Sequence, residues 1–250
     1  MTTTRVERTA PAGSARATRA LLACGVVAGP LYVVVTLVQG LTRDGFDPRV
    51  NTFNVMTTGD LGWLQRTNGL LTGVLMVLFA VGVSRVLRTG RFAAWGARLL
   101  GLYGVAIMVG GIFPSDPQPG FPAGTTPEMV RTTWHGIVHQ GARGGGYLIL
   151  TMASLVIAWS LAAEGRRAWA WFTVAAVPVL GAVMLAAHNP LAPGADVTGN
   201  PMVRLVFFAP LGLTWAWAFA FATHLYRRTL GGENGLFTTR NTLRGATHPQ

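Results

Sequence analysis

Six mainly apolar segments of about 20 residues each constrain what this chain can fold into more than any other feature. A helix needs about 20 such residues to cross a hydrocarbon core of about 30 Å. Such segments cross as helices because a bilayer offers no water to backbone polar groups. We place the spans at residues 21–41, 67–87, 96–113, 144–163, 168–187 and 202–226. The sequence therefore predicts an all-α integral membrane bundle of six transmembrane helices, forming one domain over residues 20–228.

The composition supports a membrane location and argues against nucleic-acid binding. Half of the residues are hydrophobic, 12% are charged, and the mean hydropathy is +0.41, outside the usual balance of a soluble domain. All 20 basic residues are arginines and the net charge is +11, but these arginines cluster between the apolar spans, as the positive-inside rule describes. Abundant Ala, Gly and Val are typical of a bacterial protein. The single cysteine, Cys24, excludes an intrachain disulfide and is interpreted as a small buried residue.

The arginine distribution also predicts the orientation in the cell membrane. Fourteen arginines fall on the side of the two termini and six on the other, so both termini are expected in the cytoplasm. The terminal segments 1–19 and 229–250 are polar and are predicted to be disordered cytoplasmic tails. The connections on the extracytoplasmic side are the long ones and are rich in Trp, Phe, Pro, His and Asp. We expect them to fold over the bundle.

A short extracytoplasmic helix is predicted before the fourth span. Thr126 is a suitable N-cap, Pro127 suits the first helical position, and Glu128 suits the positive end of the helix dipole. One unbroken helix from there to Ala163 would be about 55 Å long. We therefore expect a break at the glycine run 144–146, leaving a surface helix of about 16 residues.

Two histidines on this predicted helix are the strongest candidates for chemistry. His135 and His139 are four residues apart and can hold one metal ion, with Arg143 one turn further on. His188 and Asp116 are the candidate additional ligands, and zinc is the metal that these residues suit. A metal-bound water could support hydrolysis. In the alternative interpretation, the histidines hydrogen-bond loop carbonyls. Haem binding by two histidines is a third hypothesis.

A second group of polar residues precedes and opens the second span. It comprises Asp60, Trp63, Gln65, Arg66 and Asn68. Polar side chains at that depth either satisfy the backbone or line a pocket. For Arg66 the candidate partners are Asp60 and a lipid phosphate, because the guanidinium fork matches either anion.

Small residues predict close helix packing inside the bundle. Gly25 and Gly29 are spaced as a small-xxx-small pair in the first span, and Gly69 and Gly73 repeat the spacing in the second. Such faces suit helix contacts within a monomer, and they are equally compatible with a homodimer.

Several short motifs together resemble the Domain of Unknown Function 998 family of bacterial multi-pass membrane proteins. They are Gly25 to Pro30, the block from Gly62 to Asn68, Phe113-Pro114-Ser115-Asp116-Pro117, and Trp134-His135-Gly136 with His139. Their order and spacing cover most of the chain. The resemblance implies a six-span membrane fold and supplies no activity.

Two functions remain open from the sequence. The first is a binding protein with an accessory or transport-like role, whose extracytoplasmic pocket takes a lipid head group or a small molecule. Its candidate ligand-binding residues are Asp60, Trp63, Gln65, Arg66, Asn68, Asp116, His135, His139 and Arg143. The alternative is a metal-dependent membrane hydrolase that uses His135, His139, His188 and Asp116. No catalytic residue can be assigned, so the sequence leaves open whether the chain is an enzyme.

Overall fold

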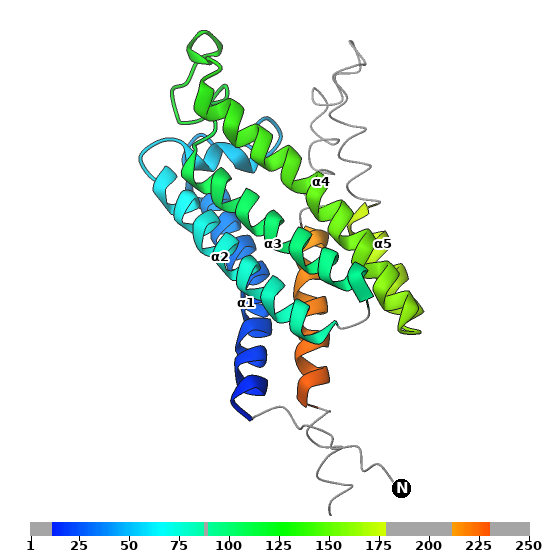
Figure 1. Ribbon diagram of the computed structural model, residues 1–250. Helices are drawn as coiled ribbons and strands as arrows, with labels where there is room; N and C mark the ends of the chain where they lie inside the picture. Colours follow the sequence, from blue (N-terminus) through cyan, green and yellow to red (C-terminus); the bar gives the residue numbers. More distant parts are fainter. Residues whose placement is uncertain (1–11, 88–89, 179–211, 231–250) are drawn as a thin grey trace, which may run out of the picture.

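The computed structural model describes residues 12–87, 90–178 and 212–230, and within them the fold is all-helical (Figure 1). The α-helices are α1 (Ala12–Thr42), α2 (Gly62–Val86), α3 (Gly90–Ile112), α4 (Trp134–Ala163) and α5 (Arg167–Ala176). A further helix covers residues 212–230. Two short 3-10 helices, η1 (Phe53–Thr57) and η2 (Pro127–Met129), lie in the long connections. The predicted all-α class is confirmed.

Four of these helices are long and apolar enough to cross a membrane. They are Ser14–Thr42, Gly62–Val86, Phe92–Ile112 and Trp134–Ala163, and they correspond to the first four predicted spans. The fifth and sixth predicted spans, 168–187 and 202–226, lie partly outside the described residues. The helix α5 ends at Ala176, two residues before Pro178, as expected where a proline removes a backbone donor. Six spans therefore stay a prediction.

Small residues bring the helices into close contact, as their spacing predicts. A Cβ atom on Gly25 would lie 2.5 Å from the ring of Phe79 on α2, and one on Gly29 would lie 3.0 Å from the Trp215 carbonyl oxygen. The helix 212–230 thus packs directly against α1. Cys24 is partly buried and packs against the same core, in line with its predicted role.

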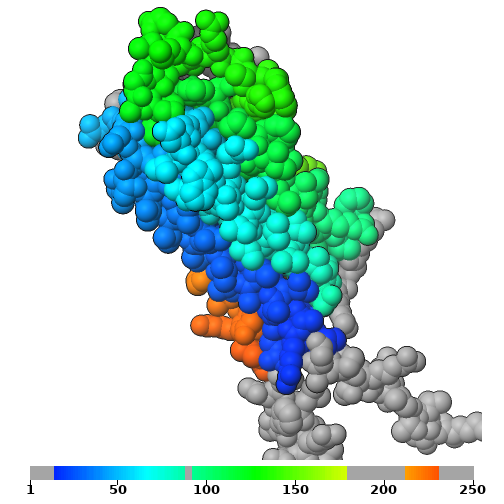
Figure 2. Space-filling view, turned by 90° about the vertical axis from the view of Figure 1, so that its left-hand side faces the viewer, coloured from blue at the N-terminus to red at the C-terminus, as the bar shows by residue number. Residues whose placement is uncertain are grey.

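The long connections 43–61 and 113–133 gather at one end of the bundle (Figures 1 and 2), and the short connection between α4 and α5 lies toward the other, which we call the short-connection end (Figure 1). The start of α1 and the end of the helix 212–230 share the short-connection end. Glu164 binds Arg166 at 3.4 Å and Arg228 at 3.5 Å there, while Arg166 donates to His224 at 3.1 Å. These contacts hold the end of α4 against the helix 212–230.

The two long connections, 43–61 and 113–133, fold together into a unit that we call the cap. Arg43 holds it to α1 by donating to the carbonyl oxygens of Met56 and Thr58, both at 2.6 Å, and its guanidinium lies over the Phe121 ring at 4.7 Å. Burial lowers the pKa of Arg43, although an arginine stays protonated in proteins. The cap has its own buried cluster of Val55, Met56 and Phe121. The prediction that these connections fold over the bundle is confirmed.

The predicted break before the fourth span is wrong. The helix α4 runs unbroken from Trp134 to Ala163 through the glycine run, so the predicted surface helix of about 16 residues is not separate from the fourth span. Thr126 and Pro127 begin only the three-residue η2. Glycine costs about 1 kcal/mol relative to alanine in a helix, and packing offsets that cost: a Cβ on Gly146 would lie 3.2 Å from Ala106. At 1.5 Å per residue, α4 is about 45 Å long.

The predicted amino-terminal tail overlaps the start of α1. The helix α1 begins at Ala12, so its first eight residues lie within the predicted tail, which ends at residue 19. The segment is rich in alanine and arginine, which are strong helix formers. The predicted carboxy-terminal tail lies almost entirely outside the described residues.

Candidate functional site

A layer of buried polar side chains joins α1 to α2. The Gln65 amide donates to the Thr36 hydroxyl at 3.0 Å, and its carbonyl accepts from Gln39 at 2.8 Å. The Asn68 amide donates to the Tyr32 carbonyl oxygen at 3.2 Å. All of these side chains are at most 4% exposed. Hydrogen bonds between apolar helices fix their register, so the layer holds Tyr32 at a defined depth.

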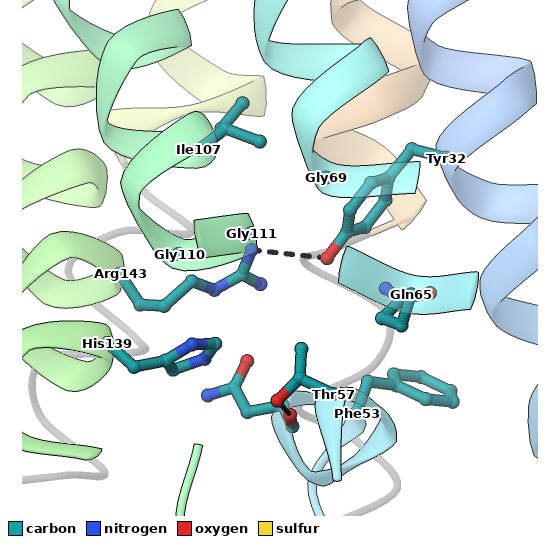
Figure 3. A pocket seen from close by; sticks show the side chains of 11 residues that line it. Tyr32, Phe53, Thr57, Gln65, Gly69, Ile107, Gly110, Gly111, His139 and Arg143 are labelled. Carbon is teal, nitrogen blue, oxygen red and sulfur yellow. Dashed lines mark hydrogen bonds between the residues drawn. The ribbon is translucent and has the colours of Figure 1, made fainter. Parts of the chain in front are cut away.

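A small polar cavity lies beside this layer, between the helices and the cap (Figure 3). Its volume is about 20 Å³, enough for about one water-sized group. The helices contribute Tyr32, Gln65, Gly69, Ile107, Gly110, Gly111, His139 and Arg143, and η1 contributes Phe53, Asn54 and Thr57. The cap therefore closes the cavity at the end where the long connections gather.

Arg143 is the dominant charge on this cavity. It lies about 14 Å along α4 from Trp134, inside the fourth candidate span. Its Nη1 donates to the Tyr32 hydroxyl at 3.1 Å, while its buried Nε has no hydrogen-bond partner. Among the described residues, no carboxylate lies within ion-pair distance of it. Charges inside membranes normally pair or serve a function.

His139 supplies a second polar atom with no partner. The side chain is 2% exposed, and its Nδ1 lies 2.9 Å from the Phe113 carbonyl oxygen. That oxygen can only accept, so Nδ1 carries the proton and Nε2 is the remaining ring nitrogen. Nε2 is buried and has no hydrogen-bond partner. His139 and Arg143 both lie against Gly110 of α3 and point toward the same space (Figure 3).

Asp116 supports the start of α4 through hydrogen bonds to its N-cap residue. Its carboxylate accepts from the Thr133 backbone amide at 3.1 Å and from the Thr133 hydroxyl at 2.6 Å. Thr133 is the N-cap residue and accepts from the Gly136 amide at 3.1 Å. A Cβ atom on Gly136 would collide with the Asp116 carboxylate. The Ser-Asp and Trp-His-Gly motifs therefore form one helix cap.

Replacing Gly136 by alanine is expected to destabilise the protein by about 1–2 kcal/mol, the usual cost of losing an N-cap. The added methyl group displaces the Asp116 carboxylate, which lies on that side of the helix. The temperature at which monodisperse protein is lost on heating measures the effect.

The matched control for this variant is Gly145→Ala on the same helix. No atom lies within 4 Å of a Cβ at Gly145, so this change should stabilise α4 by up to about 1 kcal/mol. Equal losses of thermal stability in both variants would contradict both the N-cap at Thr133 and the unbroken course of α4.

The remaining predicted site residues lie away from the cavity. Arg66 donates to the carbonyl oxygens of Gly111 and Ile112, at 3.3 and 3.0 Å, and so satisfies the end of α3. Asp60 and Trp63 are exposed. His135 stacks on Trp134 with ring centroids 3.7 Å apart. Of the predicted ligand-binding residues, the structure brings Gln65, His139 and Arg143 to the cavity, with Asn68 directly behind Gln65.

The predicted metal site stays untested. The described residues hold no group of three or more His, Cys, Asp or Glu side chains suited to a metal ion. His188 lies outside the described residues, and so does any site it would complete. Zinc binding and metal-dependent hydrolysis therefore stay predictions.

Several residues of the buried polar layer and of the cavity wall were missed by the sequence analysis. Tyr32, Thr36 and Gln39 lie inside the first span, at the three- to four-residue spacing that puts polar groups on one face of a helix. That spacing was the available signal. Phe53, Asn54 and Thr57 belong to the cap, and no local pattern places them over the cavity.

The apolar helices and the buried polar layer between them indicate a multi-pass integral membrane protein. A comparison with protein-family models matches residues 26–224 to the family described as Protein of unknown function (DUF998). Because the match covers well over half of the chain, the chain belongs to the DUF998 family, as its motifs predicted. No curated protein and no solved structure matches the chain.

Proposed function

We propose that this protein binds an oxyanion, such as the acidic head group of a lipid or of another small molecule, in the cavity between Arg143 and His139. One observation carries the proposal. An arginine inside a candidate span shares a cavity with a buried histidine nitrogen, and among the described residues neither the Arg143 Nε nor the His139 Nε2 has a partner. A buried polar group without a partner needs a physical explanation, and a bound ligand supplies one.

The hydrogen-bonding capacity of the two side chains fits an acid. Arg143 has the Nε and Nη2 edge of its guanidinium available, because only Nη1 hydrogen-bonds to a described residue. That edge is the one that receives a carboxylate or phosphate through two parallel bonds. His139 Nε2 accepts from a protonated acid, or donates when the imidazole is protonated. The site thus suits an acid in either protonation state.

We further propose that this cavity faces the outside of the cell membrane. The cap lies at the end of the bundle opposite to the connection between α4 and α5 (Figure 1). The sequence concentrates its arginines on that opposite side, which the positive-inside rule assigns to the cytoplasm. Both termini are then cytoplasmic. The role that fits is binding or presentation of a ligand at the extracytoplasmic half of the membrane.

Titration with acetate and with inorganic phosphate tests the proposal. Protein labelled with ¹⁵N-arginine, in a neutral detergent, should show one Nε resonance that shifts and saturates as the acid is added. That resonance should be missing from Arg143→Gln and present in the control Arg98→Gln, whose arginine is exposed on α3. An Arg143 resonance that does not respond to either acid would refute the proposal.

A further inference from the structure

A second hollow adjoins the polar cavity and differs from it in size and chemistry. Its volume is about 320 Å³, at the lower end of the range typical of small-molecule sites. We call it the apolar groove. Its walls are mainly hydrophobic and include Val33, Leu37 and Leu41 of α1, Phe46 and Phe53 of the cap, and Gly212.

The groove and the polar cavity share two walls. Tyr32 and Phe53 line both, so the two hollows meet at these two side chains. Tyr32 also contacts the charged side chain of the polar cavity, since its hydroxyl accepts a hydrogen bond from Arg143. The side chains of Leu37 and Leu41 on the groove wall are 48% and 86% exposed. Because these residues belong to a candidate span, the groove opens sideways toward lipid.

From this adjacency we propose that the ligand is a fatty acid, with its carboxylate on Arg143 and His139 and its acyl chain in the apolar groove. The inference rests on the proposed oxyanion site and deepens it. The polar cavity of about 20 Å³ has room for about one water-sized group. A flat carboxylate with two oxygens fits that space better than a tetrahedral phosphate with four.

The groove keeps the acyl chain out of water, which the small cavity does not do. An acyl chain gains little by moving from lipid into an apolar wall, but it arrives through the bilayer and stays in contact with it. The carboxylate gains the paired donors of Arg143, which match its two oxygens. The site should therefore select an acid over an alcohol of equal chain length, and a long acid over a short one.

Native mass spectrometry of the protein released from a neutral detergent tests this specificity. The three probes are hexadecanoate, hexadecanol and acetate. We expect a one-to-one complex with hexadecanoate, at least tenfold weaker binding of hexadecanol, and at least tenfold weaker binding of acetate. The Arg143→Gln variant should reduce hexadecanoate binding to the level of hexadecanol.

A pair of tryptophan variants on α1 tests the groove itself. Leu37→Trp fills it and should weaken hexadecanoate binding at least tenfold, with acetate binding unchanged. Val38→Trp is the matched control, because Val38 is 52% exposed on the same helix and does not line the groove. Both variants should retain the thermal stability of the wild type.

The outcomes separate this inference from the oxyanion site on which it rests. Acetate binding that depends on Arg143, with no gain from the acyl chain and no effect of Leu37→Trp, would overturn the fatty-acid assignment and keep the oxyanion site. It would also point to another occupant of the groove, such as residues 179–211 or a second copy of the chain. Binding of hexadecanol as tight as hexadecanoate, unaffected by Arg143→Gln, would overturn both.

Discussion

Replacing Arg143 by methionine is expected to raise the stability of the ligand-free protein while it removes oxyanion binding. Methionine keeps much of the side-chain volume and leaves no charge in the span. An uncompensated cation in a low-dielectric setting is costly, and apolar replacements of buried charges are often stabilising. We expect the free energy of unfolding to rise by about 1 kcal/mol, which corresponds to a rise in Tm of about 2–4 °C for a chain of this size. Loss of one partner of a buried charge pair weakens binding by about 2–5 kcal/mol.

The two readouts change in opposite directions, which makes this variant informative. If Arg143 instead served only to hold α4 to α1 through Tyr32, methionine would lower the stability. Tyr32→Phe is the control, because it removes only the hydroxyl that accepts from Arg143. It should cost about 1 kcal/mol of stability and retain most of the binding. An Arg143→Met variant that is less stable than Tyr32→Phe would contradict a ligand-binding role for the charge of Arg143.

A valine at Gly73 is expected to destabilise the bundle by about 3 kcal/mol or more. Gly73 faces Gly104 and Met108 of α3, where the two helices approach each other closely. A Cβ atom there would lie 2.6 Å from the Gly104 carbonyl oxygen and would collide with Met108. A backbone atom cannot rotate away, so α2 and α3 would have to separate along their length. Overpacking in cores costs about 1–3 kcal/mol where side chains can adjust, and more is expected here.

Gly101→Ala is the matched control on the same interface. Its Cβ would lie 3.5 Å from the Ala80 methyl group, an ordinary van der Waals contact, and alanine favours the helix by about 1 kcal/mol. Size-exclusion profiles after heating should show early loss of the Gly73→Val peak and an unchanged or later loss for Gly101→Ala. Equal behaviour of the two would mean that α2 and α3 are not packed as closely as described.

The apolar pattern was sufficient to predict the helical membrane fold and four of its spans. A membrane span must be long enough to cross the bilayer. The length of an apolar segment therefore predicts a span from the local sequence alone. The glycine spacing of Gly25, Gly29 and Gly73 likewise predicted close packing, because only small residues let helix backbones approach. The glycine run 144–146 misled the prediction, since packing of Gly146 on α3 outweighs the low helix propensity of the run.

The candidate site was predictable only in part. Gln65 was singled out as a polar residue where the second span enters the membrane, and His139 and Arg143 were singled out by their spacing on a predicted helix. Asp116 was singled out as a candidate metal ligand and Arg66 as a partner for an anion, yet they hold the ends of α4 and α3. Whether such a side chain meets a backbone group or a cavity depends on contacts between residues far apart in the chain. Phe53 reaches the cavity only because the cap folds over it, which no local pattern encodes.

The most direct test of the central claim is a solid-state NMR measurement of dipolar coupling between a carboxyl-¹³C-labelled hexadecanoate and ¹⁵N-arginine in the protein. If the acid is bound at Arg143, the carboxyl carbon should couple to a guanidinium nitrogen in the wild type and in Arg98→Gln, and this coupling should vanish in Arg143→Gln. A coupling that persists without Arg143, or no coupling in the wild type at saturating acid, would contradict the account.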